Sequence, residues 1–222
     1  MSITEKLTTL KKALPKQVML VAVSKTKPVS DLMEAYNAGQ RVFGENKIQE
    51  MAEKWEEMPK DIQWHMIGHV QRNKVKYMAE FVDLIHGVDS LKLLKEINKQ
   101  AKKHNRVINC LLQIKIAEED SKFGLSAEDT KSILSSEEFS ELQNIKIVGL
   151  MGMATFTDDV SQVKKEFQFL KRLFDELKPQ ETKNCVLQTL SMGMSGDYQL
   201  AIDCGSNMVR IGSSIFGARN YD

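Results

Sequence analysis

The chain has 222 residues, 42% of them hydrophobic, and its 31 basic and 30 acidic residues leave a formal net charge of +1. A chain of this length can bury one large core, so we expect a single domain over residues 1–222. The charges are spread along the sequence without a basic block, which argues against a nucleic-acid partner.

No segment is apolar over the length of a signal peptide's core or a membrane span, so we expect a cytoplasmic protein, and we expect it to be a monomer. The three cysteines, Cys110, Cys185 and Cys204, are odd in number and lack CxxC spacing. This pattern predicts ordinary thiols rather than disulfides or zinc ligands.

An amphipathic helix is predicted over residues 3–14, and apolar, strand-like runs then alternate with charged segments of helical period. Helices are predicted at 47–58, 70–81, 90–104 and 160–178, and their charged faces are expected to be solvated. The eight strand-like runs are VMLVAVSK (18–25), QRVFGEN (40–46), QWHMIGH (63–69), DLIHGVD (83–89), INCLLQIKIA (108–117), IKIVGLMGMAT (145–155), CVLQTLSMG (185–193) and MVRIGSSIFG (208–217).

Eight strand-then-helix units predict a single (β/α)8 barrel of the TIM type with an extra N-terminal helix. The alternative is an open, doubly wound sheet. The first strand is not followed by the glycine-rich turn of dinucleotide-binding sheets, which favours the barrel.

Lys25 and Lys27 follow the first strand, where a barrel of this type collects its chemistry. Side chains alternate along a strand, so Lys25 continues the face of Val21 and Val23 into the barrel mouth. A neighbouring cation and partial burial would both lower the pKa of Lys25 from about 10.4 and make a neutral amine available to a carbonyl. Lys25 is therefore a candidate Schiff-base lysine, although a solvated loop is an equally good interpretation of these residues alone.

The far end of the chain supplies a candidate phosphate site. Arg210 is followed by Gly212 and Ser213 in VRIGSSIFG, and Ser191 begins a second glycine- and serine-rich segment, SMGMSGD. Loops after the seventh and eighth strands of such barrels often bind phosphate, and they lie beside the first strand. A lysine next to a phosphate site fits either binding of pyridoxal 5'-phosphate (PLP) or a Schiff-base aldolase.

Five segments resemble the pyridoxal phosphate homeostasis proteins, which are related to the N-terminal domain of alanine racemase. The segments are AVSKTKP (22–28), FGENKIQE (43–50), WHMIGHVQRNK (64–74), LSMGMSGD (190–197) and VRIGSSIFG (209–217). The resemblance implies PLP held covalently on Lys25, with Arg210 facing the pyridine nitrogen and Asn46 close to the cofactor. It also implies that Ser191, Gly212 and Ser213 hold the phosphate.

The resemblance further implies a carrier or buffer in vitamin B6 homeostasis without robust catalytic turnover, with PLP-dependent apoenzymes as possible partners. An arginine at the ring nitrogen makes the ring a poor electron sink. The sequence ends at Asp222, soon after the eighth strand, so we expect no second racemase domain. The alternative is an enzyme, either a PLP-dependent amino-acid racemase or a Schiff-base aldolase.

Lysines and histidines elsewhere at the strand ends are further candidates. Lys122 matches a lysine of the family in the loop after the fifth strand. A role for Lys27 or Lys122 in releasing the cofactor is one interpretation, and for Lys122 a solvated loop lysine is the other. His65 and His69 share a strand face, but without a nearby carboxylate or cysteine they are expected to be core or mouth histidines, and no metal site is predicted.

Overall fold

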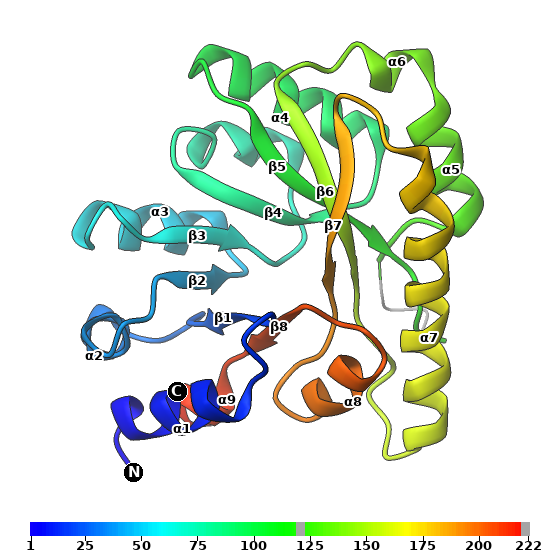
Figure 1. Ribbon diagram of the computed structural model, residues 1–222. Helices are drawn as coiled ribbons and strands as arrows, with labels where there is room; N and C mark the ends of the chain where they lie inside the picture. Colours follow the sequence, from blue (N-terminus) through cyan, green and yellow to red (C-terminus); the bar gives the residue numbers. More distant parts are fainter. Residues whose placement is uncertain (119–122, 219–222) are drawn as a thin grey trace.

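The computed structural model describes residues 1–118 and 123–218. Eight parallel strands close into a barrel in chain order, because β1 pairs with both β2 and β8 (Figure 1). This confirms the predicted TIM-type barrel over the open sheet, and one barrel holding all eight strands is compatible with the single domain expected. The strands are β1 (Met19–Val23), β2 (Val42–Glu45), β3 (Gln63–Met66), β4 (Val82–Val88), β5 (Ile108–Ile114), β6 (Ile145–Gly152), β7 (Cys185–Ser191) and β8 (Met208–Ile211).

Helices follow the strands and cover the outside of the barrel (Figure 1). The extra N-terminal helix is present and ends one residue before its predicted limit. The helices are α1 (Ile3–Ala13), α2 (Val29–Asn37), α3 (Ile48–Glu57), α4 (Leu91–Lys103), α5 (Ala127–Ser135), α6 (Glu137–Ser140), α7 (Val160–Leu177), α8 (Tyr198–Asp203) and α9 (Ser213–Phe216), with 3-10 turns η1 (Arg72–Tyr77) and η2 (Lys178–Gln180).

The helix predicted over residues 70–81 is wrong in type, because the segment forms the 3-10 turn η1. The buried residues Val75, Met78 and Ala79 have the three- and four-residue spacing that suggests an α-helix. The backbone instead bonds three residues back, from the amide of Lys74 to the carbonyl of Gln71 at 2.9 Å and from the amide of Met78 to the carbonyl of Val75 at 3.1 Å, which is the pattern of a 3-10 turn.

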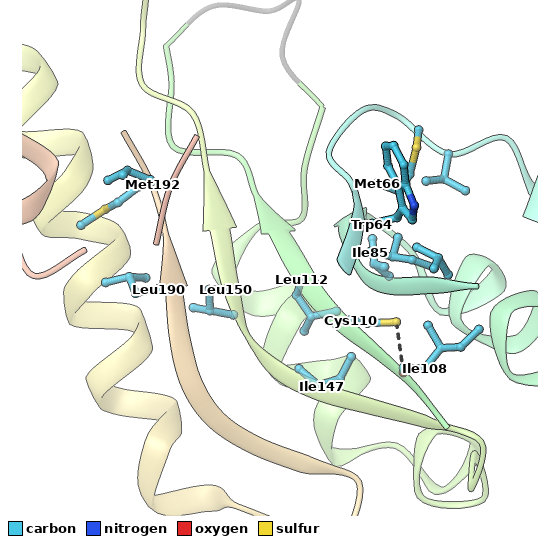
Figure 2. Packing of buried hydrophobic residues seen from close by; sticks show 14 of the residues in the cluster. Trp64, Met66, Ile85, Ile108, Cys110, Leu112, Ile147, Leu150, Leu190 and Met192 are labelled. Atoms are coloured by element: carbon cyan, nitrogen blue, oxygen red, sulfur yellow. Dashed lines mark hydrogen bonds between the residues drawn. The ribbon is translucent and has the colours of Figure 1, made fainter. Parts of the chain in front are cut away.

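The hydrophobic core has two parts. The larger lies between the strands and the helices, where Leu112, Leu150 and Leu190 of neighbouring strands turn outward (Figure 2). The smaller fills the barrel interior and consists of Val21, Leu84, Leu111, Met151 and Met208. Because the interior is packed in this way, it is a core rather than a pore, and polar chemistry is restricted to its remaining positions.

The cysteines are free thiols, as predicted. Burial raises the pKa of Cys185 to about 11 and raises that of Cys110 further, so neither is a reactive thiolate at neutral pH. In the described part of the chain, no helix is both long and apolar enough to cross a membrane.

Candidate functional site

A cavity of about 690 Å³ opens at the carboxyl ends of the barrel strands. Its volume lies within the range of small-molecule sites. Residues at the ends of β1, β2, β3, β5, β6, β7 and β8 or in the loops after them line it, so segments from both ends of the sequence meet there. The predicted site residues on its lining are Lys25, Asn46, Arg210, Gly212 and Ser213.

Lys25 reaches this cavity by the strand alternation that the sequence predicts. Val21 belongs to the barrel interior, and Val23 and Lys25 then line the cavity. Thr26 is exposed with a left-handed backbone, φ +64°, and Lys27 lines the cavity again. The Lys27 ammonium donates to the carbonyl of Ala218 at 2.9 Å. Two lysines therefore face one pocket, as the sequence suggests.

Arg210 lies on β8, which pairs with β1, and is only 4% exposed. Its guanidinium donates to the carbonyl of Ser191 at 3.0 Å, to the Ser191 hydroxyl at 2.6 Å and to the carbonyl of Gly152 at 3.1 Å. Burial lowers the pKa of Arg210 to about 10, although the nearby Asp197 carboxylate acts to raise it, and the guanidinium stays charged at neutral pH. Within residues 1–118 and 123–218 no carboxylate pairs with it at ion-pair distance. The cavity wall therefore carries a positive charge supported by neutral acceptors.

Ser191 lies behind Arg210, is fully buried, and is not among the residues that line the cavity. Its hydroxyl oxygen lies 3.3 Å from His86 Nδ1, and His86 Nε2 lies 3.0 Å from His65 Nδ1. β4 and β7 are not neighbours in the barrel, so the contact between His86 and Ser191 crosses the interior. The phosphate role expected for Ser191 stays a prediction, since the structure gives its hydroxyl two protein partners.

The donors and acceptors in this chain of contacts assign its protons. Asp83 faces His65 Nε2 at 3.6 Å, so a neutral His65 carries its proton on Nε2 and accepts at Nδ1 from His86 Nε2. A neutral His86 then accepts at Nδ1 from the Ser191 hydroxyl, whose oxygen accepts from Arg210. Burial, followed by the charges of His65 and Arg210, lowers the pKa of His86 well below its usual range. A neutral relay thus supports Arg210.

Asn46 lines the cavity and packs closely against the backbone of Gly68. A Cβ on Gly68 would lie 2.4 Å from the Asn46 carbonyl oxygen, so only glycine allows this close approach. The side-chain Oδ1 of Asn46 is buried and has no hydrogen-bond partner in the described part of the chain. Such an orphaned acceptor at a pocket wall favours a polar ligand.

Gly212 and Ser213 stand where β8 gives way to α9. The Gly212 amide donates to the Ser195 hydroxyl at 3.3 Å, and the Ser213 side chain is exposed toward the cavity opening. A Cβ at Gly212 would lie 3.0 Å from the carbonyl of Val23. Glycine therefore lets β8 approach the strand that leads to Lys25.

The two histidines of WHMIGH are separated by the fold. His65 is buried in the barrel, while His69 is exposed at the mouth and stacks on Phe123 with ring centroids 4.9 Å apart. From the sequence we expected no carboxylate near either histidine, but each has one. Asp83 lies 3.6 Å from His65, and Asp89 lies 3.5 Å from His69. No group of three or more possible metal ligands gathers among the residues that the structure describes.

The prediction that the charged helix faces are all solvated is wrong at two positions. Lys54 of α3 is 5% exposed and Glu166 of α7 is 6% exposed. Glu166 accepts the amide and the hydroxyl of Thr155, both at 2.7 Å, and so fastens a loop on the cavity lining. For Lys54 a signal exists in the sequence, because it lies three residues after Met51 on the buried stripe of α3.

Lys122, considered above for release, lies outside the described residues.

Comparison with known proteins places the chain in a family. Residues 1–220 match the family model described as alanine racemase, N-terminal domain. Alanine racemase from Bartonella henselae shares the fold at 17% identity with a TM-score of 0.76, over 97% of this chain and 58% of the racemase chain.

Two proteins are more similar. The pyridoxal phosphate homeostasis protein of Haemophilus influenzae is 41% identical over 207 residues, which are 92% of this chain and 86% of that protein. PipY of Synechococcus elongatus is 36% identical over 97% of this chain and 100% of its own, with TM-scores of 0.91 for the structure without PLP and 0.88 for the structure with PLP bound. The chain therefore belongs to the pyridoxal phosphate homeostasis protein family, on the barrel fold that this family shares with the N-terminal domain of alanine racemase.

Proposed function

We propose that this protein binds PLP in the cavity, joined to Lys25 as a Schiff base, and serves as a carrier or buffer of the vitamer without robust turnover. One observation carries the proposal: Lys25 and Arg210, 185 positions apart in a 222-residue chain, line the same cavity with Gly212 and Ser213. The PLP-bound PipY structure and the family name support the choice of ligand.

The donor set fits such a ligand. Lys27 supplies positive charge for an anionic group, and Ser213 supplies a hydroxyl beside the Gly212 amide, which donates to Ser195 at 3.3 Å. The orphaned Oδ1 of Asn46 is an acceptor for a hydrogen bond from the ligand. When bound, the cofactor supplies an aldehyde, which condenses with a neutral amine to form C=N and release one water.

Arg210 is the reason to propose holding rather than catalysis. Its guanidinium donates to two carbonyls and a hydroxyl, and the Asp197 carboxylate acts on it only from beyond ion-pair distance. A guanidinium cannot accept a proton, and it disfavours a second positive charge beside it. A pyridine ring facing it is expected to stay unprotonated and to be a poor electron sink.

The proposal extends to the setting of the protein. We propose a cytoplasmic monomer that passes PLP to PLP-dependent apoenzymes. Size measurement of the purified protein tests the first part, and reactivation of an apoenzyme by the loaded protein, compared with free PLP at the same concentration, tests the second.

The visible spectrum tests the linkage directly. Purified protein mixed with PLP is expected to show an absorption band that borohydride abolishes, and Lys25→Ala is expected to lose the band. Lys16→Ala, at an exposed lysine outside the cavity, is the matched control and is expected to keep it. Absence of the band in the unaltered protein would contradict the proposal, and Lys25-dependent exchange of an amino acid's α-hydrogen at high turnover would favour the enzyme alternative.

A further inference from the structure

A buried cluster of three charges lies behind Lys25 and consists of Glu45, Glu50 and Lys54, hereafter the charge cluster. The Lys54 side chain is 7% exposed, that of Glu45 is 0% exposed and that of Glu50 is 22% exposed. The Lys54 ammonium lies 2.8 Å from Glu45 Oε1 and 2.7 Å from Glu50 Oε1. These residues come from the end of β2 and from α3, on the outer side of the barrel wall.

The charge cluster forms hydrogen bonds with both chain neighbours of Lys25, Ser24 and Thr26. Lys54 donates to the carbonyl of Ser24 at 2.8 Å, and the Ser24 hydroxyl donates to Glu45 at 2.6 Å. On the other side, the amide of Thr26 donates to Glu50 at 2.6 Å. Lys54 thereby uses its three donors on Ser24, Glu45 and Glu50.

These contacts fix a tight turn. The amide of Lys27 donates to the carbonyl of Ser24 at 3.1 Å, and Thr26 takes φ +64° at the third position, as in a type II turn. A β-branched residue disfavours this backbone, so the turn needs an external support. The bond from Thr26 to Glu50 is such a support, because it engages the amide of the strained residue itself.

Stability alone does not explain the charge cluster. A buried ion pair seldom stabilises a fold more than apolar residues of similar volume, because desolvation offsets the attraction. Here one oxygen of Glu45 also has no partner in the described part of the chain, and burial raises the pKa of Glu45. A costly arrangement that contacts both neighbours of one lysine suggests that its role is to position that lysine.

We infer that the charge cluster positions Lys25 and selects it over Lys27 as the amine that takes the aldehyde. Both lysines line the cavity, so their chemistry alone does not separate them. The turn held by Glu50 and Lys54 determines which lysine amine is directed toward the ligand. This inference rests on the proposed function, and Glu45, Glu50 and Lys54 are positioning residues because none of them lines the cavity.

The site of labelling tests the selection. Reaction of either lysine forms one C=N bond and releases one water, and borohydride then reduces the C=N bond to a stable amine that peptide mass mapping locates. The unaltered protein is expected to carry the label on Lys25. Glu50→Ala removes the acceptor of the Thr26 amide, and we expect the ratio of Lys27 to Lys25 labelling to rise by roughly tenfold, as expected for loss of a hydrogen bond to a charged group.

Two matched variants separate positioning from simple destabilisation. Glu50→Gln keeps an oxygen acceptor for the Thr26 amide and is expected to carry the label on Lys25, as the unaltered protein does. Glu53→Ala removes an exposed carboxylate from the same helix and is expected to leave the ratio unchanged. Lys54→Met is the strongest variant if it folds, and the Glu50 pair decides the question if it does not.

Each outcome has one meaning. A Glu50→Ala protein that melts earlier but keeps the original Lys27 to Lys25 ratio would overturn the inference and leave the proposed function intact. An unaltered protein that carries no label on Lys25 would instead overturn the proposed function. A raised ratio that Glu50→Gln reverses supports the selection.

Discussion

Lys54 and Arg210 are both cations buried at the barrel wall, and they are held in opposite ways. Lys54 lies between the carboxylates of Glu45 and Glu50. Arg210 is surrounded by carbonyls, the Ser191 hydroxyl and the neutral histidine relay. The charge of Lys54 is therefore balanced inside the protein, whereas the charge of Arg210 faces the cavity and acts on a bound ligand. A buried cation is thus structural or ligand-directed according to its partners.

Removal of Lys54 is expected to have the largest effect on stability. Lys54→Met leaves the buried Glu45 carboxylate uncompensated, and breaking a buried pair in this way costs about 3–5 kcal/mol of unfolding free energy. Urea denaturation at neutral pH measures it. Lys171→Met, which breaks the exposed pair with Asp175, is the control and is expected to cost less than about 1 kcal/mol. Equal losses in the two variants would contradict a structural role for the charge cluster.

Removal of Arg210 is expected to cost less. Arg210→Met removes one donor from each of two carbonyls and a hydroxyl and leaves no buried ion pair broken, so we expect a loss of about 1–3 kcal/mol. The same urea experiment ranks the two variants. If Arg210→Met were less stable than Lys54→Met, Arg210 would have to be a structural cation as well, and the comparison would fail.

The histidine relay predicts a smaller effect that depends on pH. Burial lowers the pKa of both His65 and His86, so each is neutral in the folded protein at a pH where an unfolded histidine, with a pKa near 6.5, takes up a proton. The unfolded state then binds more protons, and stability falls as pH drops below about 6.5. The slope is at most about 1.4 kcal/mol per pH unit for each histidine.

Matched variants isolate the contribution of the relay. His86→Gln is expected to reduce the pH dependence of the unfolding free energy between about pH 5 and 6.5, and His104→Gln, at an exposed histidine, is expected to leave it unchanged. The raised pKa of Glu45 acts in the opposite direction at more acidic pH, since folding then favours the protonated carboxyl. A slope that is the same in both variants would show that His86 is not held neutral.

Much of this molecule follows from local patterns in its sequence. Eight alternating units predict the barrel, and strand alternation carries Lys25 into the cavity beside Arg210. These inferences succeed because the side-chain period of a strand and the common edge of a parallel barrel are geometric constants.

What could not be predicted depends on contacts between distant segments. Ser191 appears in the sequence as a loop hydroxyl suited to phosphate, but the barrel turns it inward to meet His86 from a strand that is not adjacent. Glu50 and Lys54 have the i, i+4 spacing of a common solvated pair, and only the packing of α3 behind the turn at Ser24 buries them. The periodicity of a sequence predicts which face of a helix or strand a side chain lies on, whereas its hydrogen-bond and ion-pair partners depend on the tertiary fold.

The central claim is that Arg210, whose guanidinium donates to neutral acceptors and has no carboxylate at ion-pair distance in the described part of the chain, makes this a site for holding PLP rather than for carbanion chemistry. Nuclear magnetic resonance of protein loaded with PLP that carries an isotope label at the ring nitrogen tests it most directly. We predict an unprotonated ring nitrogen at neutral pH in the unaltered protein. A ring nitrogen that is protonated there would contradict the account.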